Sequence, residues 1–164
     1  MEKSLAIANG LIQLATSHGK PPTQMKLQKL IFFSHGWYLA ICDAPLVDEG
    51  FQAWPYGPVI PSVYHEFKAY GTLGIDRPGT EFVFTPNGLE WIPPVVTDQT
   101  GAVQGLLNKI WDVFGKYSGG QLSEMTHVKG SPWKQMREQY GDVRDIPIPD
   151  EIIKKYFKGL MSNA

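Results

Sequence analysis

The sequence predicts a compact α+β domain that is mainly α-helical and is built around one buried helix. The stretch 25–40, MKLQKLIFFSHGWYLA, is apolar on nearly its whole circumference, which is typical of a helix covered on several sides. Amphipathic segments at helical spacing precede and follow it. Only short alternating segments, separated by turn residues, have the character of strands, so we expect a small antiparallel β element in a single domain, 1–164.

The first two helices are expected at 4–17 and at about 24–42. The first carries an apolar stripe, and Ser4 is a candidate cap for its start. Two prolines then prevent the chain from continuing as a helix. Thr23 is a favourable N-cap for the central helix, which ends before the next proline.

Three residues of the central helix need a specific interpretation. We expect the stems of Lys26 and Lys29 to lie on apolar surface while their ammonium groups reach water. Cys42 is interpreted as a small core residue, and because it is the single cysteine it excludes an internal disulfide.

The segment after the central helix changes character. Apolar pairs on either side of 48–50, Asp-Glu-Gly, predict a short hairpin. Residues 54–58, Trp-Pro-Tyr-Gly-Pro, are expected to form a fixed bend without regular structure, since they contain two prolines and a glycine. A third helix should occupy 61–70, with a proline in its first turn.

The second half of the chain predicts two strands and then four helices. The alternation in 81–85 and the turn at 86–88 indicate strands on both sides of the turn, the second at 89–92. Helices are expected at about 100–117, 121–128 and 132–140, and from Asp150 towards the end of the chain. The glycine pair 119–120 could hold an anion at a helix N-terminus, but a plain turn between helices is favoured.

The composition excludes several classes of protein. Hydrophobic residues make up 43% of the sequence and charged residues 19%, as in a globular protein. The net charge of −1 gives no overall attraction for nucleic acid or a membrane surface, so we expect neither as a partner. The first twenty residues lack the layout of a signal peptide, and we expect a cytoplasmic protein.

The usual catalytic and metal-binding motifs are absent from the sequence. There is no phosphate-binding loop and no nucleophile elbow. The sequence His65-Glu66 begins like a zinc-protease helix, but Ala69 stands where the second histidine is required. We therefore assign no catalytic residue, no metal ligand and no cofactor. An enzyme that uses His35, His65 or His127 in a pocket near the central helix stays open as an alternative.

Aromatic residues near bends and helix starts are the best candidates for a binding surface. Tryptophan and tyrosine are favoured at protein interfaces, although packing under loops explains the same pattern. The candidate partner-binding residues are Trp54, Tyr56, Tyr64, His65, His127 and Trp133.

Three motifs in combination resemble the Panacea domain family, which includes SocA-like and GepA-like proteins. They are LQKLIFFSHGW at 27–37, AWPYGPV at 53–59 and LSEMTHVKGSPW at 122–133, and the similarity extends from about Leu5 to Phe157. Proteins of this family are often linked to phage and mobile elements. The resemblance implies an antitoxin that neutralises a toxin encoded by a neighbouring gene, usually by direct binding.

The resemblance also implies that such an antitoxin can deliver its toxin to a Clp-type protease as an adaptor. The family has no established catalytic residues. An alternative is a phage- or mobile-element-borne protein that binds another host protein.

Overall fold

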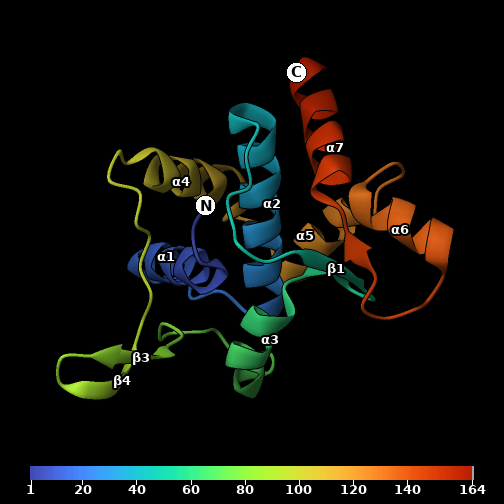
Figure 1. Cartoon of the computed structure of the whole chain (residues 1–164). Helices are drawn as coiled ribbons and strands as arrows, with labels where there is room; N and C mark the ends of the chain where they lie inside the picture. Colours follow the sequence, from blue (N-terminus) through green and yellow to red (C-terminus); the bar gives the residue numbers. More distant parts are fainter. Residues whose placement is uncertain (164) are drawn as a thin grey trace.

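The computed structural model describes residues 1–163 and contains helices packed with two small sheets (Figure 1). The helices are α1 (Ser4–Ser17), α2 (Gln24–Cys42), α3 (Pro61–Phe67), the 3-10 helix η1 (Lys68–Tyr70), α4 (Ala102–Phe114), α5 (Gly119–Thr126), α6 (Pro132–Tyr140) and α7 (Asp150–Ser162). The strands are β1 (Phe51–Trp54), β2 (Gly57–Val59), β3 (Glu81–Thr85), β4 (Gly88–Ile92) and β5 (Pro147–Ile148). The predicted fold class, α+β and mainly α, is confirmed. No helix of residues 1–163 is long and apolar enough to cross a membrane.

Helix α2 is the centre of the fold, as predicted. It contacts α1, α3, α4, α5, α7 and strand β2, and Figure 1 shows it running through the middle of the molecule. The Thr23 hydroxyl accepts a hydrogen bond from the Lys26 N–H, so the predicted N-cap is present. In its last turn Ile41 and Cys42 are exposed. The prediction that Cys42 is a core residue is therefore wrong.

The start of α1 differs from the prediction. Ser4 is the first helical residue and not its cap. The Asp48 carboxylate accepts hydrogen bonds from both the N–H and the hydroxyl of Ser4. Val47 forms a parallel bridge with Glu2, so no hairpin surrounds residues 48–50. The predicted hairpin there is wrong because the N-terminal segment takes the place of its second strand.

The hairpin lies instead within the segment that was predicted to be an irregular bend. Strands β1 and β2 pair antiparallel, with Trp54 opposite Gly57, so Pro55 and Tyr56 form the turn. Strand β5 pairs with the other edge of β1, which gives the order β2-β1-β5. Pro58 is tolerated because β2 is an edge strand and the Pro58 carbonyl, its one backbone polar group, points away from β1 towards Lys29.

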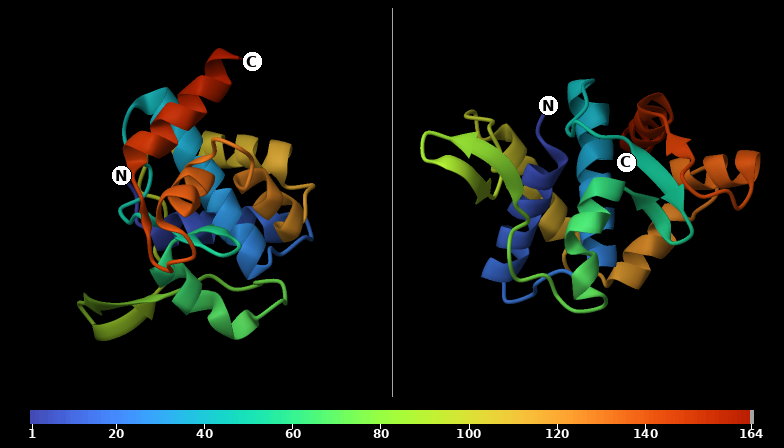
Figure 2. Two further views of the ribbon diagram at one scale, coloured as in Figure 1. Left: turned by 90° about the vertical axis from the view of Figure 1, so that its right-hand side faces the viewer. Right: turned by 60° about the horizontal axis from the view of Figure 1, so that its bottom comes forward.

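The β3–β4 hairpin projects from the helical body in every view of Figures 1 and 2. Its strands have the predicted positions, and its register places Phe82 opposite Trp91 and Phe84 opposite Leu89. These four side chains therefore share one face of the hairpin. Glu81, on the opposite face, forms an ion pair with Lys3 next to α1.

The packing of α7 on α2 depends on Gly36. A Cβ atom built on Gly36 overlaps the ring of Phe157, a buried residue of α7. We predict that Gly36→Ala lowers the free energy of unfolding by roughly 1–3 kcal/mol, since the ring must move within a close-packed core. Denaturant unfolding measures this change.

The matched control is Gly105→Ala in α4, where the added methyl group meets open space. Alanine is the better helix former, so this variant should gain about 0.5–1 kcal/mol. A Gly36→Ala protein as stable as the wild type would contradict the described contact between α2 and α7.

Candidate functional site

The predicted binding residues gather around the β1–β2 hairpin but differ in exposure. Trp54 and Trp133 are buried, and the Trp133 indole N–H donates to the Trp54 carbonyl at 2.7 Å. The rings of Trp54 and Tyr64 meet edge to face, with 4.9 Å between their centroids. Tyr56, at the turn, is 71% exposed. Trp54 and Trp133 thus have a structural role whether or not they also contact a partner.

The histidine candidates occupy separate positions. His65 is exposed on α3 beside Tyr64, whereas His127 caps the end of α5 and lies against Trp133 with 3.7 Å between ring centroids. The third histidine considered for catalysis, His35, is buried and bonds the Asp150 carboxylate at 2.9 Å. Within residues 1–163, no group of three or more His, Cys, Asp or Glu residues is placed to hold a metal ion.

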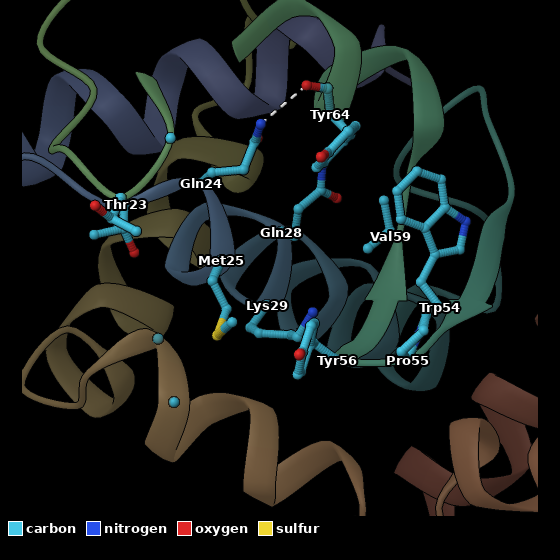
Figure 3. A pocket seen from close by; sticks show the side chains of 14 residues that line it. Thr23, Gln24, Met25, Gln28, Lys29, Trp54, Pro55, Tyr56, Val59 and Tyr64 are labelled. Carbon is cyan, nitrogen blue, oxygen red and sulfur yellow. Dashed lines mark hydrogen bonds between the residues drawn. The ribbon is translucent and has the colours of Figure 1, made fainter. Parts of the chain in front are cut away.

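A half-open pocket of about 440 Å³ lies between the β1–β2 hairpin and the first turns of α2 and α5 (Figure 3). Three of the predicted residues, Trp54, Tyr56 and Tyr64, line it. The remaining lining residues are Thr23, Gln24, Met25, Gln28, Lys29, Pro55, Val59, Gly71, Thr72, Gly119 and Gly120. The lining contains no carboxylate, so its only side chain that can carry charge near neutral pH is a lysine.

That lysine, Lys29, was predicted from the sequence to place its ammonium group in water, but the group is buried. Its side chain is 1% exposed, and its ammonium group donates to the Pro58 carbonyl at 3.0 Å. The expectation that its charge reaches water is wrong, because the β1–β2 hairpin covers it. A Cβ atom on Gly57 would lie 2.6 Å from Cε of Lys29, and glycine is required there also for its φ of +111°. Burial lowers the pKa of Lys29 from its usual 10.5 to about 7.

Gln28 extends this contact of α2 to Ile60, the residue that follows strand β2. Its amide oxygen accepts from the Ile60 N–H at 2.9 Å, and its amide nitrogen donates to the Ile60 carbonyl at 3.3 Å. Gln28 and Lys29 together bond the edge of β2 that faces away from β1, as a further strand would. Ser123 of α5 adds a bond from its hydroxyl to the Tyr56 carbonyl at 2.7 Å. Side chains of two helices therefore fix the hairpin that forms one wall of the pocket.

A second surface, the apolar face of the β3–β4 hairpin, was not among the predicted sites. We call Phe82, Phe84, Leu89 and Trp91 the hairpin face. These side chains are between 49% and 86% exposed, and the rings of Phe82 and Trp91 lie 4.9 Å apart. The signal was present in the sequence, since strands in register across the Pro86-Asn87 turn place these four residues on one side.

Comparisons with known proteins identify the family. The family described as antitoxin SocA-like, Panacea domain, matches residues 27–134, which include the hairpin face and all of the pocket lining except residues 23–25. The chain belongs to the SocA-like Panacea family. Antitoxin SocA of Caulobacter vibrioides (strain NA1000 / CB15N) is 32% identical over 156 residues, which cover 93% of this chain and 81% of that protein. No solved structure shows a significant match. The resemblance seen in the sequence is therefore confirmed, and membership of this family supports an antitoxin role.

The buried Lys29 predicts a specific dependence of stability on pH. Between pH 7 and 10.5 this amine is neutral in the folded chain and protonated in the unfolded chain, so unfolding takes up a proton. Raising the pH over this interval therefore stabilises the fold, by roughly 2 kcal/mol between pH 7 and 9. Below pH 7 both states are protonated and Lys29 contributes no slope.

The measurement is the difference in the free energy of unfolding between the wild type and Lys29→Met as a function of pH. Methionine has a similar length and does not titrate. The contributions of all other titrating groups therefore cancel in the difference between the two proteins. If the free energies of unfolding of the two proteins ran parallel between pH 7 and 9, the Lys29 amine would be shown to stay charged in the folded chain.

Proposed function

We propose that this SocA-like protein neutralises a cognate toxin by binding it directly, without catalysis. The observation that carries the proposal is the hairpin face, an apolar surface on a projecting two-stranded hairpin. Apolar residues on an isolated hairpin normally turn towards the body of the protein, yet here the aromatic side chains point outward. Such exposed patches mark surfaces that a partner covers.

The size of the hairpin face fits a protein contact. At the exposed fractions of its four residues, it presents on the order of 500 Å² of apolar area. A standard interface buries about 800 Å² on each partner, with an apolar centre and a polar rim. The hairpin face is therefore large enough to form the centre of an interface with a toxin.

The sequence-predicted residues add a second part to the proposed contact surface. Tyr56 stands exposed at the turn between β1 and β2 and lines the pocket together with Tyr64. His65 is also exposed. An exposed tyrosine on a rigid turn contributes contact area with little loss of side-chain freedom. We propose that the toxin contacts both this region and the hairpin face, and that the bound antitoxin covers the toxin's active surface.

The experiment is a growth assay with co-purification. The neighbouring gene is induced alone, with the wild-type protein, and with the variant Phe84→Ser/Leu89→Ser. The wild type should relieve growth arrest and co-purify with the toxin. The variant should bind at least about thirtyfold more weakly, because two anchor side chains are removed from the centre of the interface. Titration of the purified toxin measures the affinity.

The control is Val83→Ser/Glu90→Ser, which changes the opposed pair on the other face of the same hairpin. It should bind as the wild type does. A harmless neighbouring gene would contradict the antitoxin proposal. Relief of arrest without co-purification would contradict neutralisation by stable binding and would favour delivery to a Clp-type protease or an enzymatic antidote.

Tyr56 and Trp54, two aromatic residues of the predicted site, differ in exposure, so their substitution should have different effects. Tyr56→Ala should weaken toxin binding by about 2 kcal/mol and leave the melting temperature unchanged, since the removed ring is exposed. Trp54→Ala should instead cost about 3–5 kcal/mol of folding free energy, because it leaves a cavity between β1 and α3. Calorimetric binding and thermal unfolding of both variants test this. Unfolding of the Tyr56→Ala protein would assign that ring to the core.

A further inference from the structure

Two helix N-termini meet at the pocket. Gln24 and Met25 begin α2, Gly119 and Gly120 begin α5, and all four residues line the pocket. The two starts are in contact, since a Cβ atom on Gly119 would lie 3.0 Å from the Lys26 nitrogen. The first N–H groups of a helix have no carbonyl partner within it, and they carry partial positive charge. The pocket therefore presents two sets of such donors.

Buried polar side chains supply an independent indication of a ligand. The Lys29 ammonium lies in the same wall with one carbonyl partner, and no carboxylate of residues 1–163 lies within ion-pair distance of it. Gln24 is 8% exposed, and its amide nitrogen donates to the Tyr64 carbonyl at 2.9 Å. Its amide oxygen has no hydrogen-bond partner. The pocket thus borders an amine without a carboxylate partner and an amide oxygen without a hydrogen-bond donor.

Much of the rest of the pocket wall is apolar. Trp54, Val59 and Tyr64 line the side formed by the β1–β2 hairpin and α3, and Met25 adds an apolar side chain at the start of α2 (Figure 3). A volume of about 440 Å³ is enough for one large side chain together with its backbone. A fitting ligand therefore combines an anionic group, an N–H donor and an apolar group within the size of one residue.

We propose that this pocket binds the C-terminal residue of a polypeptide, with an apolar side chain. Its carboxylate faces the N-termini of α2 and α5 and Lys29, whose amine takes up a proton from solvent as the carboxylate binds. Its N–H donates to the Gln24 oxygen, and its side chain packs on Trp54 and Tyr64. Both buried side chains, Lys29 and Gln24, turn towards the ligand as it enters. The proposal rests on the proposed function, because it takes the polypeptide to be the toxin.

The test uses N-acetyl-L-phenylalanine and its amide, which differ only in the charge of the terminal group. Binding is followed by the NMR shifts of the backbone amides of 119–121. The wild type should bind the acid roughly tenfold more tightly than the amide. In Lys29→Met the ratio of the affinities for acid and amide should fall towards one. Met25→Trp, which fills the pocket from a half-buried position, should bind neither compound while remaining folded.

Equal affinity of the wild type for acid and amide, or a preference that survives in Lys29→Met, would overturn the proposal. Inorganic phosphate that displaces the acid and binds as tightly would also overturn it, because the apolar wall would then contribute nothing. These outcomes leave toxin binding through the hairpin face untouched, so the two proposals fail separately.

A second arm distinguishes a polypeptide from a free small molecule. The toxin is prepared with its last residue deleted and titrated against the wild type. Deletion should weaken binding at least tenfold. Unchanged affinity, with the preference for N-acetyl-L-phenylalanine intact, would assign the pocket to a free carboxylate and overturn the assignment to a polypeptide end.

Discussion

The contact between Gln28 and Lys29 of α2 and the outer edge of β2 is the interaction on which the pocket region depends. Three backbone polar groups, at Pro58 in β2 and at Ile60 just after it, would be buried without partners if these side chains were apolar. Burying a lysine without an acid is costly, and the lowered pKa of Lys29 reflects that cost. Through these hydrogen bonds α2 holds the β1–β2 hairpin, which positions Tyr56 and closes one side of the pocket. The motifs LQK at 27–29 and WPYGP at 54–58 therefore form one structural unit, because side chains of the first bond the backbone of the hairpin that contains the second.

Most of the fold follows from local patterns, and the exceptions have a physical cause. Apolar periodicity, the Thr23 cap and the prolines predicted the helices because these signals act within a few residues. The same local rules failed at 54–58, where two prolines and a glycine indicated an irregular bend. There, pairing with 51–54 and bonds from α2, α5 and α6 override local preference. Lys29 was misplaced for the same reason, since the chain that covers it lies about thirty residues away in the sequence.

The candidate site was predicted only in part. The aromatic residues near the bend do lie around a pocket, and the family followed from the sequence. These residues differ in exposure, however. Trp54 and Trp133 are buried and support the hairpin, while Tyr56 is accessible. The hairpin face could have been predicted from the alternation in 81–92, but whether such a face points inward or outward depends on what packs behind it. The polar part of the pocket could not be predicted, because it combines helix starts and a buried lysine that are brought together only by folding.

The central claim is that the hairpin face and the pocket together bind a toxin, and hydrogen–deuterium exchange of the purified complex tests it most directly. The account predicts slower exchange on toxin binding in β3 and β4 and at the start of α5, with α6 unchanged. These segments are distant in sequence, so joint protection would define one contact surface. Protection confined to α6 and α7, with the β3–β4 hairpin exchanging at its free rate, would contradict the account and place the toxin on another face.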